Sequence, residues 1–471
     1  MQTQCNTNRM EFHPHNKRHV LADFDGGKIT SDAGAALLRE AEMRLGAIDA
    51  FSGCFTDHRD QRYVEHSVKD LVAQRVMGLC LGYEDINDHE QLRRDPALAL
   101  AVGKADIEGN DRARQRDRGG ALAGKSTLNR QELAGDSAST DRYKRIELDM
   151  EKASDVFVEL FLRMNKKAPK RITLDLDATD DILHGLQEGR FFHGYYRDYC
   201  YLPLYIFCGE HLLCAKIRPA NIDAGDGAVE ELDRIVSKIR QTWPKVRIKI
   251  RADSGFCREH IMSWCEDNGV GFVLGLAKNE RLTELLSGKM AEAKALFEDS
   301  GQASRLYGEF GYRTRQSWSR SRRVIGKAEH LSKGANPRFI VTSIDAEEMG
   351  GKELYEDVYC ARGDMENRIK EQQTYMFADR TSSATMRANQ IRLWFSSVAY
   401  TLMQYIRSVA LEGTELARAQ CHTIRLKLLK IGARIRVTAR RIWISMASGC
   451  PYAKIFERAL IALGKSPPIY C

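Results

Sequence analysis

The sequence predicts an α/β fold, with a mixed sheet that follows a mainly helical N-terminal region. Residues 25–103 repeat apolar side chains at helical spacing. Residues 171–276 then give three strand-like segments, a helix, a strand, a helix and a strand. With 471 residues the chain is too long for one simple core, so several domains are expected.

The composition is that of a globular protein with a basic C-terminal end. Hydrophobic residues make up 43% and charged residues 29%, with a net charge of +8. Residues 411–471 hold 11 Lys/Arg against 3 Asp/Glu, together with Trp443, Tyr452 and Phe456. A basic segment dotted with aromatic residues fits nucleic-acid contact, and a solvated helical face is the alternative.

No membrane segment is expected, because no apolar run approaches the roughly 18 residues that a membrane span needs. The N-terminus shows no apolar signal-peptide core. The twelve cysteines are scattered without a Cys-x2-Cys pair, so we expect reduced cytoplasmic thiols and no zinc site.

The N-terminal elements follow from apolar spacing. Residues 1–22 are polar and are expected to be flexible or a loose edge strand. A charged, glycine-rich loop is predicted for residues 104–120. Helices are predicted over 66–81, 85–93, 97–102 and 141–164.

Gly119–Ser126 matches the phosphate-binding pattern Gly-x4-Gly-Lys-Ser. That motif needs a buried strand directly before it. Here the preceding residues are Asp111-Arg-Ala-Arg-Gln-Arg-Asp-Arg118, which cannot form a central strand. A turn before a short helix is therefore favoured, and no nucleotide cofactor is expected.

The segment around which the core is organised is 171–178. Ile172, Leu174 and Leu176 alternate with polar residues, so Asp175 and Asp177 share the face opposite the apolar one. Carboxylates on such a strand are costly to bury unless a partner neutralises them, and a divalent metal ion is one such partner.

The remaining elements are placed in the same way. Residues 303–345 have the texture of a β-rich insertion, and the tail is expected to be helical at 423–429 and 453–463. Further strands are predicted at 191–208, 211–217, 246–252, 271–276 and 354–361, and helices at 227–243, 260–268, 282–297, 363–377 and 386–410.

Three acids can converge in this scheme. Asp177 is near the end of the first strand, Asp253 directly follows the strand 246–252, and Glu366 is in the first turn of a helix. Carboxylates of this kind suit magnesium, and two such ions support phosphodiester chemistry. Lys370, one helical turn after Glu366, or Arg362 could then hold a phosphate.

The chain resembles bacterial insertion-sequence transposases of the DDE type, specifically the IS-thirteen-eighty family. The resemblance covers nearly the whole chain. The segments that show it contain Asp175-Leu-Asp-Ala-Thr-Asp-Asp, Arg251-Ala-Asp-Ser-Gly-Phe and Tyr359-Cys-Ala-Arg-Gly-Asp-Met-Glu366. A fourth segment begins with Ala378-Asp-Arg-Thr-Ser-Ser.

The resemblance implies an RNase H-like catalytic core in which Asp177, Asp253 and Glu366 bind Mg²⁺, or Mn²⁺, and catalyse DNA cleavage and strand transfer. Asp177-Ala-Thr fits the first motif better than Asp175, which stays the alternative. Related transposases carry Tyr-x2-Arg-x3-Glu-x6-Lys. Tyr359, Arg362 and Glu366 fit, but the lysine position is Gln373, so Lys370 is expected to contact the phosphate instead.

The resemblance also implies that a tryptophan of the insertion holds a displaced DNA base. Trp318, with Arg322 beside it, is the candidate, and an ordinary packed aromatic is the alternative.

The expected domains are a helical DNA-end-binding or dimerisation domain (1–165), the core in two parts (166–285 and 351–410), the β-rich insertion (286–350) and the basic helical C-terminal region (411–471). The expected partners are terminal-repeat and target DNA, with a homodimer in the complex, in the bacterial cytoplasm at the nucleoid. A metal-dependent nuclease without strand transfer, and a catalytically silent DNA-binding protein, are the alternatives.

Overall fold

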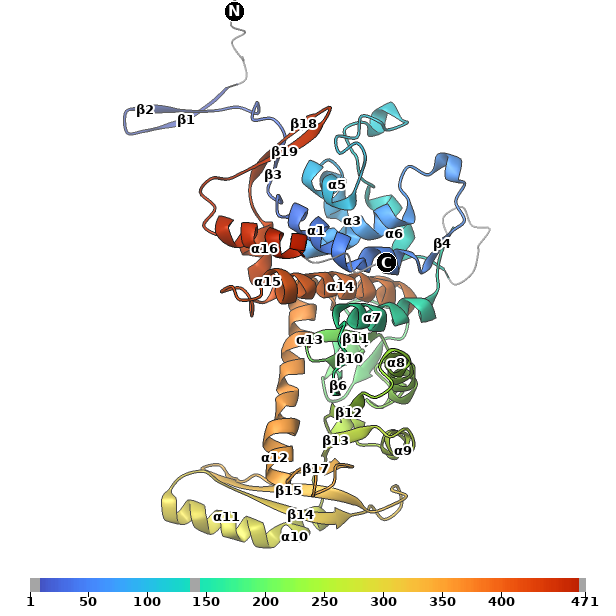
Figure 1. Cartoon of the computed structure of the whole chain (residues 1–471), viewed down its shortest axis with the longest axis vertical. Coiled ribbons are helices and arrows are strands. Elements are labelled where there is room, and N and C mark those ends of the chain that lie inside the picture. Colours follow the sequence, from blue (N-terminus) through green and yellow to red (C-terminus); the bar gives the residue numbers. More distant parts are fainter. Residues whose placement is uncertain (1–8, 136–144, 466–471) are drawn as a thin grey trace, which may run out of the picture.

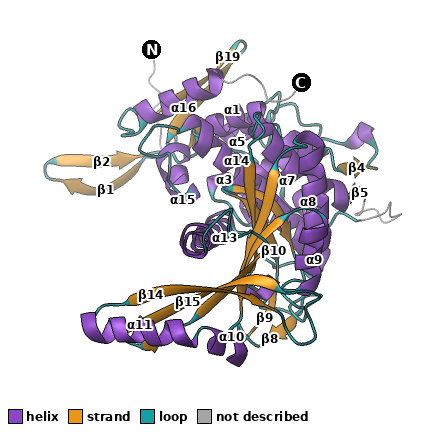
Figure 2. Cartoon of the chain, turned by 60° about the horizontal axis from the view of Figure 1, so that its bottom comes forward, coloured by secondary structure: helices purple, strands orange, loops and turns teal. Residues whose placement is uncertain are grey.

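The computed structural model describes residues 9–135 and 145–465. Its centre is a large mixed sheet with helices on both faces (Figures 1 and 2). A helical body lies at one end of this sheet, and the strands β14, β15 and β17 lie at the other (Figure 1). No helix in the described ranges is long and apolar enough to cross a membrane.

The helical body combines both ends of the chain. Its N-terminal and C-terminal helices share one hydrophobic core, and the long helix α14 is buried between α3 and the sheet strand β11. Its helices are α1 (Ala35–Leu45), α2 (Ala47–Ser52), α3 (Val68–Leu81), α4 (His89–Leu92), α5 (Pro96–Val102), α6 (Lys125–Glu132), α14 (Met386–Tyr405), α15 (Cys421–Ile424) and α16 (Ala453–Lys465).

Short strands surround this body. Residues 10–22 form an exposed hairpin, which agrees with the loose edge strand expected there. The small strands are β1 (Met10–His15), β2 (Arg18–Ala22), β3 (Ile29–Thr30), β4 (Phe55–Asp57) and β5 (Ile146–Leu148). The helix expected over 141–164 begins only at Met150, as α7 (Met150–Met164), and residues 136–144 lie outside the described ranges.

The central sheet has the strand order β11-β10-β6-β12-β13-β17-β15-β14, with β16 paired to β15. Neighbours are antiparallel from β11 to β6, parallel from β6 to β13, and antiparallel from β13 onward. The strands are β6 (Arg171–Ala178), β10 (Leu204–Cys208), β11 (His211–Lys216), β12 (Arg247–Ala252), β13 (Gly271–Leu276), β14 (Ser304–Tyr312), β15 (Arg322–Leu331), β16 (Gly334–Ala335) and β17 (Arg338–Thr342).

The predicted strand 171–178 and the β-rich character of 303–345 are therefore confirmed. The β-rich segment extends the central sheet through β17, and α10 (Glu280–Leu285) and α11 (Ser287–Ser300) precede it. A separate small sheet contains β7 (Asp181–Ile182), β8 (Phe191–His193) and β9 (Asp198–Tyr201).

The period-two pattern of β6 decides which residues face each layer. Ile172, Leu174 and Leu176 pack against α7, α8 (Ala228–Thr242) and α9 (Glu259–Asp267). The opposite face therefore presents Asp175 and Asp177 toward the helical segment 351–376, which lies on the other side of the sheet (Figure 1).

The strand expected over 354–361 is wrong. Residues 351–376 form one continuous helical segment, from α12 (Gly351–Glu353) through a π-helical turn at Leu354–Tyr359 to α13 (Gly363–Met376). Leu354, Tyr355 and Val358 pack on the sheet at positions i, i+1 and i+4. That spacing makes one helical stripe, which overrides the strand propensity of the aromatic residues.

The expectation of an all-helical C-terminal region is also wrong for residues 433–446. β18 (Ala433–Thr438) and β19 (Arg441–Met446) form an antiparallel hairpin, and β18 pairs with β3 near the N-terminus. The alternation of apolar and polar residues along 433–438 favours a strand because the apolar residues can all face the core. Helices are present at 421–429 and 453–465, as expected.

Candidate active site

Three carboxylates from three elements line one cavity of about 710 Å³. Asp177 lies near the end of β6 and Asp253 directly follows β12. Because β6 and β12 are parallel neighbours in register, their carboxyl ends meet at one edge of the sheet. Glu366, in the first turn of α13, reaches the same cavity.

Arg362 shares its guanidinium between two of these acids. It lies 3.8 Å from an Asp177 carboxylate oxygen and 2.7 Å from a Glu366 carboxylate oxygen. Burial raises the pKa of Asp177 to about 7, Arg362 opposes this, and Asp253 and Glu366 add to it. The acids are therefore close enough to repel one another's charge.

Asp175 has a different environment from Asp177. Its two carboxylate oxygens accept hydrogen bonds from Nε and Nη2 of Arg251, at 2.5 and 2.8 Å, and it is absent from the cavity lining. Arg251 Nη1 also donates to the Val358 carbonyl. Arg251 thus connects β6, β12 and the helical segment 351–376, which are the three elements that position the cavity acids.

The turn after β12 is held close to β13. The Asp253 carboxylate accepts a hydrogen bond from the Gly255 amide at 2.8 Å. A Cβ at Gly275 would lie 2.6 Å from the Tyr359 hydroxyl and 2.9 Å from the Ser254 amide nitrogen. Only glycine allows this approach, so Gly275 and Tyr359 define where Asp253 sits.

Of the other residues singled out in the sequence, some line this cavity and some do not. Lys370 lines the cavity and is exposed, one helical turn from Glu366. Gln373 also lines the cavity, and its side-chain amide donates to the Asp181 carboxylate at 2.8 Å and to the Asp180 carbonyl at 3.1 Å. At the lysine position of the motif, the chain therefore has Gln373, whose side chain is hydrogen-bonded to Asp181 of β7.

Trp318 and Arg322 are not brought to this cavity. The Trp318 ring is only 4% exposed and packs edge-on against Tyr312. Arg322 is buried and forms 2.6 Å ion pairs with both Glu259 and Glu266 of α9. The structure therefore corrects the expectation of an available base-holding pair, because α9 supplies the two carboxylates that immobilise Arg322 beneath the ring.

Sequence reasoning missed the contribution of Tyr195 and Tyr196 in the β8–β9 hairpin. His193, Tyr195 and Tyr196 line the cavity from it, and the Tyr196 hydroxyl donates to the Ala178 carbonyl at 3.2 Å. Tyr195 is 84% exposed, which leaves its ring open to a ligand. The concentration of aromatic residues between 191 and 201 was the signal that could have indicated a binding surface.

The three carboxylates are suitable ligands for a divalent metal, although they do not surround a common point in this structure. Within residues 9–135 and 145–465, no three His, Cys, Asp or Glu side chains converge closely enough to hold an ion. The Arg362 guanidinium instead interacts with both Asp177 and Glu366. Carboxylate oxygens are the ligands that Mg²⁺ and Mn²⁺ prefer, so the chemistry of these donors fits such an ion, with Arg362 lying between two of them.

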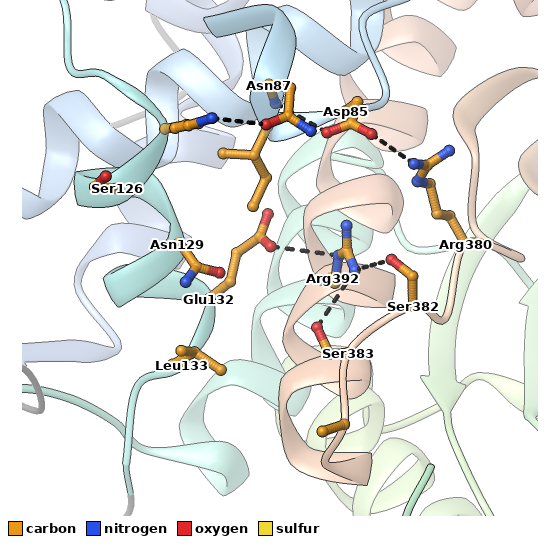
Figure 3. A pocket seen from close by; sticks show the side chains of 13 residues that line it. Asp85, Asn87, Ser126, Asn129, Glu132, Leu133, Arg380, Ser382, Ser383 and Arg392 are labelled. Carbon is orange, nitrogen blue, oxygen red and sulfur yellow. Dashed lines mark hydrogen bonds and ion pairs between the residues drawn. The ribbon is translucent and has the colours of Figure 1, made fainter. Parts of the chain in front are cut away.

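A second cavity, of about 500 Å³, lies beside the phosphate-loop-like segment (Figure 3). Figure 3 shows Arg392 directed at Ser382, Ser383 and Glu132. The Lys125 amide at the start of α6 donates to a Glu90 carboxylate oxygen at 2.8 Å. No strand precedes Gly119 in the described stretch 103–118, so the context that a phosphate-binding loop requires is missing.

Arg251→Met is expected to lower the free energy of unfolding by about 3–5 kcal/mol, because Asp175 is left buried and unpaired. Urea denaturation and the Tm measure this. Lys249→Met, on the same strand and face, is the control and should cost less than about 1 kcal/mol. Equal losses in the two variants would contradict the bracing role of Arg251.

Gly275→Ala is expected to weaken Mn²⁺ binding at the cavity by about tenfold or more, since the new Cβ displaces the turn that presents Asp253. Titration calorimetry with MnCl₂ measures this affinity. Gly363→Ala places its Cβ in open space and should bind Mn²⁺ like the parent protein. An unchanged affinity in Gly275→Ala would show that the turn tolerates the extra atom.

Asp177→Asn is expected to stabilise the metal-free protein increasingly as the pH rises. Because the folded pKa of Asp177 is about 7 and lies above the unfolded value, its contribution to stability is lost as the pH rises from about 4 through 7. The amide removes that penalty, on the order of 4 kcal/mol at pH 8, because the pKa is raised by about three units and each unit corresponds to about 1.4 kcal/mol. Tm values in EDTA between pH 5 and 8 test this, with exposed Asp357→Asn as the control. A gain independent of pH would refute it.

Comparison with known proteins identifies the family. A family model described as "Transposase DDE domain group 1" matches residues 12–468. A solved structure of piggyBac transposase, in a synaptic complex with hairpin DNA, is similar at 11% identity, covering 85% of this chain and 79% of that chain with a TM-score of 0.37. No curated protein matches the chain. Because the family model spans nearly the whole sequence, the chain belongs to the DDE transposase family described as group 1.

Proposed function

We propose that this protein is the transposase of a bacterial insertion sequence of the IS-thirteen-eighty family. It would cut DNA at the inverted-repeat ends of its element and join the freed 3′-hydroxyls to target DNA. Asp177, Asp253 and Glu366 would be the catalytic acids of an RNase H-like core. The antiparallel strands β11, β10 and β6, followed by the parallel strands β12 and β13, support that core.

The observation on which this proposal rests is the shared cavity of the three acids. They come from a strand, a strand end and a helix that are far apart in the sequence, and they line one cavity with Arg362 and Lys370. Three carboxylates gathered next to two cations suit a site that binds both metal ions and a phosphodiester.

In this proposal the carboxylates of Asp177, Asp253 and Glu366 hold two Mg²⁺ ions, or Mn²⁺. Bound ions of this kind activate a water or a 3′-hydroxyl and stabilise the leaving oxygen. Lys370 contacts a DNA phosphate beside the cavity. Arg362 neutralises Asp177 and Glu366 in the free protein and turns to a phosphate when DNA binds. The Tyr359 hydroxyl and the turn at Ser254 both lie against Gly275 of β13, so Tyr359 would support the turn that carries Asp253.

The protein would act as a homodimer on the element's ends, in the cytoplasm at the nucleoid, without ATP and without a covalent protein–DNA intermediate. The domain limits predicted from the sequence remain proposals. The shared core of the helical body supports treating residues 1–165 and 411–471 as one functional unit for DNA and dimer contacts.

Asp253→Asn is expected to reduce cleavage of a labelled element-end duplex in Mg²⁺ by about a hundredfold or more, which is roughly 3 kcal/mol of transition-state stabilisation. The variant should still bind the duplex. Asp267→Asn, an exposed position on α9, is the matched control and should cut at the parental rate.

The outcomes separate the proposed functions. Joined end–target products in a gel assay support the transposase, whereas cleavage without joining favours the nuclease. If the parent protein and Asp253→Asn both bind and neither cuts in Mg²⁺ or Mn²⁺, the silent DNA-binding protein is favoured. Equal cutting by both would show that the active site lies elsewhere.

A further inference from the structure

The hairpin of residues 433–446, here called the β18–β19 ribbon, projects from the helical body (Figure 1). It is a regular two-stranded ribbon in which each residue from Ala433 to Thr438 pairs with one from Met446 to Arg441. β18 also pairs with β3, at Ala433–Thr30 and Arg434–Ile29. The base of the ribbon is therefore fixed to the body.

The two faces of the ribbon differ sharply. Ile435 is buried in the core of the helical body, and its cross-strand partner Ile444 packs partly against the same core. The opposite face presents exposed residues only. These are the cross-strand pairs Arg434–Ser445, Arg436–Trp443 and Thr438–Arg441.

Trp443 sits at the centre of this exposed face. Its side chain is 43% exposed, and the guanidinium groups of Arg436 and Arg441 each lie 5.7 Å from the ring centroid. Such contacts hold the two arginines in place above a flat apolar surface. A large exposed aromatic residue flanked by fixed cations is typical of a contact surface, because tryptophan is otherwise mostly covered.

The arginines of the ribbon are not paired with acids in the part of the chain that the structure describes. No ion pair within residues 9–135 and 145–465 involves Arg434, Arg436, Arg440 or Arg441. Arginines elsewhere in the fold, such as Arg251, Arg322 and Arg407, are paired with acids. An uncompensated cluster of four guanidiniums attracts a polyanion.

We propose that the exposed face of the β18–β19 ribbon binds duplex DNA at the element's end, with the arginines on phosphates and base edges. A two-stranded ribbon fits the width of the major groove, and arginine forks match phosphate and guanine edges. The inference rests on the proposed transposase function and assigns part of its DNA recognition. None of the ribbon residues lines the cavity of the three acids, so DNA binding and cutting are separable.

The test compares two triple variants in the full-length protein. Arg434→Ala/Arg436→Ala/Arg441→Ala removes three charges from the ribbon. Lys166→Ala/Lys167→Ala/Lys170→Ala removes three exposed charges just before β6, at the end of the strand opposite Asp177. Binding is measured by fluorescence anisotropy in EDTA, from about 50 to 300 mM KCl, on a duplex containing the DNA that flanks the coding sequence.

The ribbon variant is expected to bind at least about tenfold more weakly than the parent at 100 mM KCl. The slope of log K against log [KCl] should fall in magnitude by about 2–3, since each lost phosphate contact contributes about 0.9. The lysine variant should keep the parental slope and bind within about threefold of the parent.

A third variant, Arg434→Lys/Arg436→Lys/Arg441→Lys, distinguishes lost contacts from a damaged ribbon. It keeps the charges, so its salt slope should return close to the parental value while its preference for the end duplex over an unrelated duplex falls. If it is as impaired as the alanine variant, the loss comes from ribbon packing and the inference is overturned.

The inference is also overturned if the alanine variant binds with the parental affinity and slope. The two proposals fail in different ways. Parental binding by the ribbon variant, with cleavage still abolished by Asp253→Asn, refutes the ribbon and leaves the transposase standing. Full cleavage by Asp253→Asn refutes the proposed active site whatever the ribbon does.

Discussion

The arrangement of the candidate site depends on one buried ion pair. Arg251 on β12 donates two hydrogen bonds to Asp175 on β6 and one to the Val358 carbonyl of the helical segment. Asp177 lies two residues after Asp175, and Asp253 lies two residues after Arg251. Burying these charges is costly, so the pair contributes little net stability. Its effect is to hold β6, β12 and the helical segment in fixed positions relative to one another. The positions of the three cavity acids follow from this arrangement.

Asp177, in the cavity, lacks the close arginine partner that Asp175 has. Asp177 is largely buried. Its carboxylate accepts a hydrogen bond from the Ala178 amide at 3.0 Å, and within the described ranges its ion pair is with Arg362 at 3.8 Å, so burial dominates its pKa. The Asp175 carboxylate is bound by Arg251, whereas the Asp177 carboxylate lines the cavity, where a ligand can reach it. Two acids on the same strand face, two residues apart, thus have separate roles because only one lies opposite an arginine on the neighbouring strand.

Local patterns in the sequence predicted β6, β12 and the approach of an acid of β6 to Asp253 and Glu366, because strand periodicity and chain order determine which ends meet. They could not choose between Asp175 and Asp177, since that choice depends on Arg251 across a parallel register. The role of Trp318 could not be decided from the sequence either. Its neighbour Arg322 is paired with Glu259 and Glu266, which lie more than fifty residues earlier. The pairing of β18 with β3 joins residues about four hundred positions apart and has no local sequence signature.

The helix of Glu366 is physically joined to the C-terminal segment. Glu371, on the same helix, accepts hydrogen bonds from Arg407 at 2.8 Å and from the Cys421 amide at 2.6 Å, and both Glu371 and Arg407 are almost fully buried. Removing either partner would leave a buried charge, so the helix cannot easily shift relative to this segment. The β18–β19 ribbon follows from the same segment and packs on the same core. On the proposed function, DNA held by the ribbon would therefore meet the acids at a fixed spacing, and that spacing would set where the cut falls relative to the bound sequence.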